Sequence, residues 1–189
     1  MVALGIATGL RCSELFALTW GDFDWANSTM FVRRAIVDGV VDEVKTKYSK
    51  AGLPLDPALA EMMLRWKAQS KFASDEDWVF ASWRTLGKKP LRSTSVLENI
   101  LKPAAQRAGL GLIGWHTFRR TFSTLLRGNG EDIKVQQELM RHADIRTTMN
   151  LYTQANSDQK RQAHGKIVQA ILVGESAECS LALPRPSGT

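Results

Sequence analysis

The sequence predicts an α+β fold that is mostly helical and contains a small three-stranded antiparallel sheet. Two observations support this prediction. Most of the chain carries apolar residues at helical spacing, whereas residues 29–55 contain short alternating segments separated by turns. The chain has 189 residues, of which 44% are hydrophobic and 23% are charged, so it can build one domain around a sizeable core.

Helices are expected both before and after the predicted sheet along the chain. The first covers residues 2–20 and is broken or turned near Gly9, and the second covers residues 57–71, where Asp56 precedes a proline at the first helical position. Ser93 and Asp144 are expected to cap two others. The remaining expected helices cover residues 93–108, 116–126, 131–141, 144–152 and 156–173.

The predicted sheet consists of three short strands. Residues 29–37 and 40–46 are expected to form a hairpin around Asp38-Gly39, a dipeptide that favours the turn between antiparallel strands. Residues 53–55 supply the third strand, which should lie at an edge because Pro54 cannot donate a ladder hydrogen bond. The preceding segment, residues 19–28, is rich in turn-forming residues and is expected to be a loop.

Composition narrows the class of partner and excludes several kinds of site. The 25 basic residues outnumber the 19 acidic ones, which gives a net charge of +6 and favours a polyanionic partner. Cys12 and Cys179 are far apart in sequence, so neither a disulfide framework nor a cysteine zinc site is expected, and a reducing, cytoplasmic location fits better. The sequence contains no run of about 18 apolar residues, so no membrane-spanning helix is expected. The segment GLGLIG (109–114) matches a dinucleotide motif but follows a helix, so we expect a turn there and no cofactor.

Three basic residues stand out in apolar surroundings. Arg11 lies in an apolar segment and needs an anionic partner if it is buried. That partner is either Glu14 or Asp22 in a salt bridge, or a phosphate that two N–H groups of the guanidinium bind together. His116 and Arg119 are three residues apart, so both side chains project from one face of the same helix. Taken alone, His116 fits a structural, hydrogen-bonded histidine better than a metal ligand, because no further ligands lie at short spacing.

A second histidine and a tyrosine lie close together near residue 150. His142 opens a polar segment that ends in Tyr152, one of two tyrosines in the chain. A single tyrosine is most often a half-buried packing residue. As a nucleophile, Tyr152 would need help to lose its proton near neutral pH, and a neutral histidine can accept that proton.

The chain contains three segments that together resemble the catalytic domain of the tyrosine recombinase (phage integrase) family: ATGLRCSELFALTWGDFDW (7–25), HTFRRTFSTLL (116–126) and ELMRHADIRTTMNLYTQ (138–154). The resemblance covers residues 3 to 172 approximately and implies the fold of DNA-breaking and rejoining enzymes. It assigns six catalytic residues, which are Arg11, Lys45, His116, Arg119, His142 and Tyr152. Lys45 is matched through KTKYSKAGLPL (45–55), where Lys47 is a nearby rival.

The resemblance implies metal-free cleavage of double-stranded DNA without a cofactor. Arg11, Arg119 and His142 would bind the non-bridging phosphate oxygens, His116 would accept the proton of Tyr152, and Lys45 would protonate the departing 5′ oxygen. The product would be a 3′-phosphotyrosine, which conserves the energy needed for rejoining. A type IB topoisomerase and a DNA-binding remnant without catalysis are the alternatives.

The resemblance also sets expectations for domains, departures and partners. Residues 1–173 would form the catalytic domain, without the N-terminal domain that clamps DNA in the family, and residues 174–189 a loose tail. The chain is expected to self-associate on DNA as a dimer or tetramer. A bacterial origin, or one in a phage or other mobile element, is also expected. Phe118, Arg120 and Arg141 replace a usual leucine, histidine and glycine, and Arg141 should alter the turn into His142. Other basic residues are expected either to meet backbone phosphates or to be solvated surface charges: Arg33, Arg34, Lys88, Lys89 and Arg92.

Overall fold

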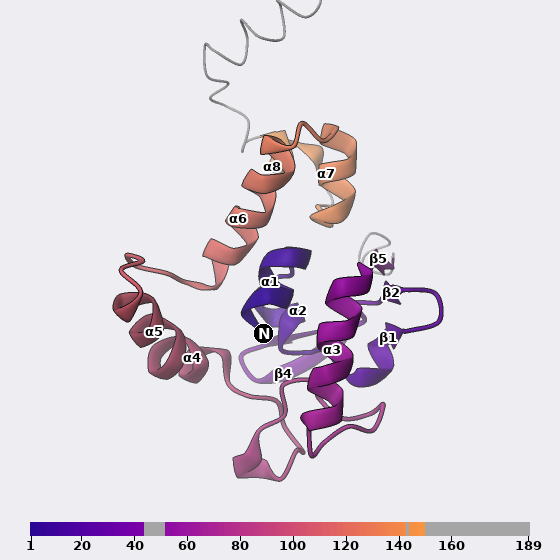
Figure 1. The fold of residues 1–189 in the computed structure, drawn as a ribbon, viewed down its shortest axis with the longest axis vertical. Coiled ribbons are helices and arrows are strands. Elements are labelled where there is room, and N and C mark those ends of the chain that lie inside the picture. The colour runs from indigo at the N-terminus through magenta and orange to yellow at the C-terminus, as the bar shows by residue number, and fades with distance from the viewer. Residues whose placement is uncertain (44–51, 143, 150–189) are drawn as a thin grey trace, which may run out of the picture. The chain divides into compact units, whose positions relative to one another are not determined.

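The computed structural model describes residues 1–43, 52–142 and 144–149 (Figure 1). All of them except Met149 belong to one compact unit, Met1–Thr148, and the account below concerns that unit. Helices supply most of its regular structure, and the strands are short and antiparallel, as the sequence predicts. None of the helices in the described part of the chain has the length and apolar character that crossing a bilayer requires.

The N-terminal segment forms two short helices separated by a left-handed turn. Helix α1 (Val2–Thr8) ends at Gly9, which has φ 59°, and α2 (Cys12–Leu15) begins two residues after Leu10. A Cβ atom on Gly9 would lie 2.3 Å from a ring carbon of Phe122, so both the backbone angle and the packing require glycine here. The predicted break near Gly9 is confirmed, but the helix ends at Leu15 and not near residue 20, where a 3₁₀ turn η1 (Trp20–Asp22) follows.

The strands form two sheets instead of one. Strands β1 (Phe23–Asp24), β2 (Thr29–Met30) and β5 (Leu53–Pro54) pair in the order β1-β2-β5, and β3 (Arg34–Val37) pairs only with β4 (Val40–Glu43). The predicted edge position of Pro54 and the hairpin turn are confirmed, with φ of 51° at Asp38 and 81° at Gly39.

The single predicted strand over residues 29–37 is wrong, and so is the predicted loop over residues 23–24. The N–H of Phe31 donates to the carbonyl of Asp22 at 2.8 Å, and the Arg34 guanidinium binds the buried Asp22 carboxylate at 2.7 Å. The first bond continues the pairing of β2 with β1, and the ion pair holds Arg34 at the start of β3, so β2 and β3 belong to different sheets. The predicted strand over 40–46 is described only as far as Glu43.

Two helical regions follow the sheets. Helix α3 (Pro57–Gln69) begins at Asp56, whose carboxylate accepts from the N–H of Ala58 at 2.9 Å, as predicted. The predicted helix over 93–108 is continuous but mixed, with α4 (Ser93–Val96), a π-helical turn η4 (Leu97–Leu101) and α5 (Lys102–Arg107). Pro103 has no N–H to close a regular helical bond, which explains the wider turn before it. Ser93 is the first residue of α4 and not its cap.

Three helices complete the described chain. They are α6 (Trp115–Gly128), α7 (Ile133–Leu139) and α8 (Ile145–Met149), and they lie together in Figure 1. Asp132 caps α7 through the N–H of Lys134 at 2.7 Å, and Asp144 accepts from the N–H of Arg146 at 2.8 Å, as predicted for that residue. The GLGLIG segment follows α5 with a left-handed Gly109, φ 68°, which confirms a turn at a helix end.

One apolar core joins the N-terminal helices to α6. Its residues with almost no exposed surface include Leu4, Leu15, Leu18, Trp20, Met30, Val32, Met63 and Val79. Phe118 of α6 is buried against it, and the Trp115 ring meets that of Phe16 edge-on with centroids 5.0 Å apart. This packing places the start of α6 beside the turn between α1 and α2, which is where Arg11 lies.

Candidate active site

Arg119 of α6 links two segments that are distant in sequence. Its side chain is buried, and the two terminal nitrogens of the guanidinium donate to the backbone carbonyls of Gly9 and Met140. Gly9 lies two residues before Arg11, and Met140 lies two residues before His142. The guanidinium of Arg119 therefore holds together one segment from each of the three motifs.

Arg11 lies at the start of α2 and reaches towards solvent. Its guanidinium donates to one oxygen of Glu14 at 3.0 Å, and its backbone N–H donates to the other at 2.7 Å. The Glu14 side chain is almost fully buried, whereas that of Arg11 is 42% exposed. The salt bridge that the sequence offered as one reading of Arg11 is thus formed with Glu14, and the exposed edge of the guanidinium can still meet an anion.

Asp22 is engaged elsewhere. Its buried carboxylate binds Arg34 through both oxygens, at 2.8 and 2.7 Å, and Arg33 at 3.3 Å. Arg34 also donates to the hydroxyl of Thr19 at 2.8 Å. Asp22 therefore fixes the turn between the two sheets and is not a partner of Arg11.

His142 is buried just after α7 and forms a hydrogen bond with a residue near the end of α8, the final described helix. Its Nδ1 lies 2.9 Å from the hydroxyl of Thr148, which has no exposed surface. Burial, and to a lesser extent the nearby charges of Arg119 and Arg11, together lower the pKa of His142 to about 4. The ring is therefore neutral at pH 7. If the Thr148 hydroxyl donates to Nδ1, then Nε2 carries the hydrogen and can donate it to an oxygen.

Arg141 introduces an additional positive charge beside this group. Its guanidinium is 1% exposed and donates to Glu14, the carboxylate that also holds Arg11. Its backbone has φ 52°, the left-handed region that favours glycine. The sequence led us to expect that Arg141, in place of the usual glycine, alters the turn into His142. In the structure Arg141 adopts a backbone conformation that glycine favours.

The electrostatics of the cluster favour an anion. Three guanidinium groups, on Arg11, Arg119 and Arg141, stand against the single carboxylate of Glu14. The pKa of Arg119 is lowered to about 10, first by burial and then by the charges of Arg11 and Arg141, while Glu14 opposes the shift. Arg119 remains charged at neutral pH. An excess of buried positive charge with free donor edges is stabilised by binding a phosphate.

The structure brings together three of the six predicted catalytic residues. Arg11, Arg119 and His142 belong to the cluster. His116 lies in the first turn of α6 and is exposed, and its ring has no hydrogen-bond partner among the described residues. Lys45, with its rival Lys47, and Tyr152 lie outside the described residues. The second tyrosine, Tyr48, and the predicted helix over 156–173 lie outside them as well.

The other predicted phosphate contacts divide into two groups. Arg33 and Arg34 both bind the carboxylate of Asp22. The Arg34 guanidinium donates to both oxygens of that carboxylate, so the nitrogen that does so is already paired within the protein. Lys88, Lys89 and Arg92 are exposed in and after the loop that follows η3 (Trp83–Thr85). Arg120, which replaces a usual histidine, is exposed on α6, whereas Phe118 is part of the core.

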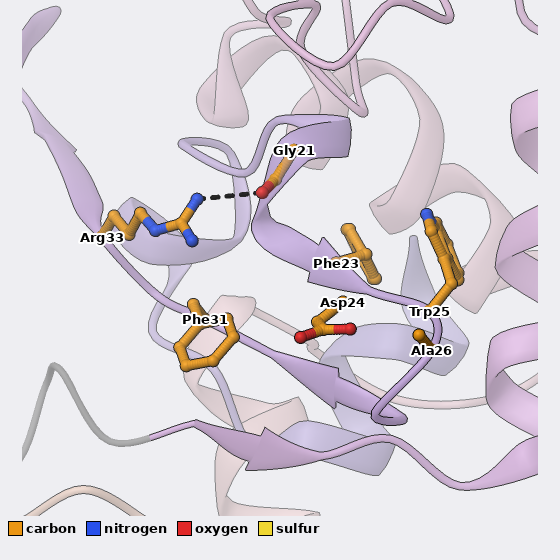
Figure 2. Close-up of a pocket in the computed structure, with 7 residues that line it drawn as sticks. All are labelled: Gly21, Phe23, Asp24, Trp25, Ala26, Phe31 and Arg33. Carbon is orange, nitrogen blue, oxygen red and sulfur yellow. Dashed lines mark hydrogen bonds between the residues drawn. The ribbon is translucent and has the colours of Figure 1, made fainter.

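An open pocket of about 520 Å³ lies beside β1 (Figure 2), and none of the residues that line it belongs to the arginine cluster. Its lining consists of Gly21, Phe23, Asp24, Trp25, Ala26, Phe31 and Arg33. The polar groups at this pocket are already paired, because Arg33 donates to the Gly21 carbonyl at 2.9 Å and Asp24 accepts from Asn27. The arginine cluster is therefore the better candidate for chemistry. Residues 1–43, 52–142 and 144–149 contain no group of three His, Cys, Asp or Glu placed to hold a metal.

Sequence reasoning missed two partners in the cluster. Glu14 was weighed only as a salt-bridge partner of Arg11, although it also binds Arg141, 127 positions further along the chain. Thr148 was not singled out, although it positions the ring of His142. The only signals for them were the acidic residue three positions after Arg11 and the paired threonines after His142.

Comparison with known proteins places this cluster in a recognised group. Residues 1–159 match the Phage integrase family. The tyrosine recombinase XerC of Roseiflexus sp. is 35% identical over 164 residues, which cover 86% of this chain and 49% of that protein. The ICEBs1 integrase of Bacillus subtilis is 27% identical over 172 residues, which cover 85% of this chain and 45% of that protein. The chain spans about half the length of the curated relatives it matches.

Solved structures share the fold. The integrase of the Tn1549 transposon, in complex with circular intermediate DNA, superposes with a TM-score of 0.74 at 24% identity. The match covers 88% of this chain and 58% of that one. The XerA recombinase gives a TM-score of 0.62 at 24% identity, covering 86% of this chain and 54% of that one.

Proposed function

The chain belongs to the phage integrase family, and from that premise we propose that it is the catalytic portion of a site-specific recombinase. It cleaves and rejoins double-stranded DNA through a covalent tyrosine intermediate, without a metal ion. The residues proposed for this chemistry are Arg11, Lys45, His116, Arg119, His142 and Tyr152.

The observation that carries the proposal is the pair of hydrogen bonds made by Arg119. By holding the carbonyls of Gly9 and Met140, its guanidinium fixes the backbone that leads to Arg11 and to His142. Three donors of the type that binds phosphate oxygens are thereby gathered from distant parts of the sequence. Donors fixed in advance at the oxygens that gain charge are usually the largest contribution to catalysis of such a reaction.

The reaction follows from the charge on the phosphodiester. The Tyr152 oxygen attacks phosphorus, His116 accepts the phenol proton, and the bond to the 5′ oxygen breaks as Lys45 protonates it. One phosphate ester replaces another, so the 3′-phosphotyrosine retains the energy for rejoining. Charge that grows on the non-bridging oxygens is met by Arg11 and Arg119, and a neutral His142 donates from Nε2.

The partners follow from the same chemistry and from the relatives. Structures of the Tn1549 integrase and of the XerH recombinase were solved with DNA, which supports double-stranded DNA as the substrate of this chain. Recombination joins two DNA sites, so self-association on DNA is part of the proposal. The named relatives are bacterial, which supports action in the bacterial cytoplasm on a chromosome or a mobile element.

A covalent trapping assay tests the proposal. The chain is incubated without metal with a pool of nicked duplexes of varied sequence, since recombinases act at defined sites. A nick just beyond the cleavage point lets the fragment with the free 5′ hydroxyl diffuse away, which prevents rejoining. We expect a protein–DNA adduct that survives denaturation, that disappears in Tyr152→Phe and that persists in the matched control Tyr48→Phe.

The other outcomes identify the alternatives. An adduct that forms on every duplex, with relaxation of supercoiled DNA at no defined site, would indicate a topoisomerase and contradict site-specific recombination. Salt-sensitive DNA binding without an adduct on any duplex would indicate a binding protein and contradict the proposed catalysis.

A further inference from the structure

We propose that Arg141 is a positioning residue of the phosphate site, which neutralises Glu14 and so leaves the guanidinium of Arg11 available to the phosphate. The inference rests on the proposed function and deepens it. Arg141 does not itself contact DNA in this arrangement, because its side chain is 1% exposed. It acts through Glu14 on Arg11.

Glu14 is the point at which the two arginines meet. One of its oxygens accepts from the Arg11 guanidinium at 3.0 Å. The other accepts from the backbone N–H of Arg11 at 2.7 Å and from the guanidinium of Arg141. The carboxylate is buried, so its charge has little access to water and must be balanced by these cations.

Competition for Arg11 is the physical reason for a second cation. A buried carboxylate with Arg11 as its sole cationic partner would attract that guanidinium strongly, at the expense of a phosphate on its exposed side. With Arg141 on the opposite oxygen, the demand of Glu14 is shared between two cations. Arg11 then keeps one edge on the protein and offers the other to an anion.

Arg141 carries features that stability alone does not explain. Its backbone is left-handed, with φ 52°, where glycine would be free of strain. Its Nε and one terminal nitrogen are buried without a hydrogen-bond partner among the described residues. Buried unpaired donors cost stability, and such groups are frequent at functional sites. An arginine in this position therefore fits a role in the charge balance of the site.

The test measures binding of dimethyl phosphate, a monoanion with the chemistry of one DNA phosphodiester. The ¹⁵N signals of the arginine Nε–H groups are followed during titration of the whole 189-residue chain. We expect Arg141→Gly, which also relieves the left-handed strain, to weaken binding about tenfold, the loss of one charge-assisted contact at Arg11. In the double variant Glu14→Gln/Arg141→Gly the competing carboxylate is gone, and binding should return to within about twofold of the unaltered chain.

Controls and contrary outcomes are defined by the same titration. Arg65→Ala removes an exposed arginine of α3 that pairs only with Glu61, and it should leave binding unchanged. Unchanged binding in Arg141→Gly would overturn the proposal. Equal weakening in the single and the double variant would also overturn it, because Arg141 would then act independently of Glu14.

A failure of folding and a failure of the proposed function can each be distinguished from a failure of the role proposed for Arg141. If Arg141→Gly does not fold, as judged by circular dichroism, the double variant decides, because a folded double variant that has lost binding would overturn the proposal. Dimethyl phosphate is bound and not cleaved, so the result does not depend on Tyr152. If the unaltered chain forms the covalent DNA adduct but the variants do not bind dimethyl phosphate as expected, only the role of Arg141 is refuted. If the variants bind as expected but no adduct forms, only the recombinase reaction is refuted.

Discussion

Lowering the pH from 7 to 5 should reduce the free energy of unfolding by about 2 kcal/mol through His142 alone. The folded chain lowers the pKa of this ring from its usual 6.5 to about 4, through burial first and then through Arg119 and Arg11. Between these two values the unfolded chain binds a proton that the folded chain does not. The stabilisation is complete above the unfolded value and is lost as the pH falls towards the folded one, up to about 3 kcal/mol in total.

Urea denaturation at the two pH values measures this effect. The six tryptophans provide the fluorescence signal, and His142→Gln is the matched control, because its amide does not titrate. Carboxylates titrate alike in both proteins, so the difference between their pH responses belongs to His142. The unaltered chain should lose about 2 kcal/mol more than the variant between pH 7 and pH 5.

Equal pH responses in the two proteins would refute this reasoning. An NMR titration of the ring signals gives the same test directly, with a midpoint near 4 expected for His142. A midpoint near the usual histidine value would mean that the ring is solvated and charged at mildly acidic pH. Its proposed role as a neutral donor to phosphate would then lose its physical basis.

Three further substitutions have expected outcomes. Gly9→Ala should lower the free energy of unfolding by more than about 2 kcal/mol in thermal melting, because φ is 59° and the new Cβ would meet Phe122 at 2.3 Å. Asp22→Asn should lower it by about 3 kcal/mol in urea, because two arginines lose their buried counter-charge. Thr148→Val should slow adduct formation about tenfold in single-turnover assays while the chain stays folded, because His142 loses the hydroxyl that orients its ring.

Each of these expectations has a clear contrary result. Unchanged melting of the glycine variant would contradict the close approach of α1 to α6. An Asp22→Asn protein as stable as the original would mean that the two arginines do not depend on the carboxylate. An unchanged rate in Thr148→Val would mean that the ring of His142 is oriented without the hydroxyl.

Local signals in the sequence predicted the helices well and the strands poorly. Ser93 and Asp144 were predicted as caps because a side-chain oxygen can meet N–H groups within the next turn, and Asp144 does so, whereas Ser93 is the first helical residue. The division of residues 29–37 depends instead on Asp22, which holds Arg34 from outside the segment. Alternation within a strand contains no information about such a partner, so the chain was assigned to one sheet instead of two.

At the candidate site, the sequence predicted which residues take part but not how they contact one another. The motifs indicated Arg11, Arg119 and His142, and the structure gathers them around the bonds of Arg119 to two backbone carbonyls. The contact of Glu14 with Arg141 spans 127 positions and depends on the packing of α6 against α1. No spacing rule along the chain can predict such a contact. The pKa of His142 likewise depends on burial and on charges that only the folded chain brings close.

The most direct test of the account is to identify the residue that carries the DNA after cleavage. The trapped adduct is digested with nuclease and protease, and the peptide that retains nucleotides is sequenced by mass spectrometry. The account predicts a single modified peptide, with the 3′ phosphate on the oxygen of Tyr152. A nucleotide on any other side chain, Tyr48 included, would contradict the assignment of the nucleophile and the mechanism built on it.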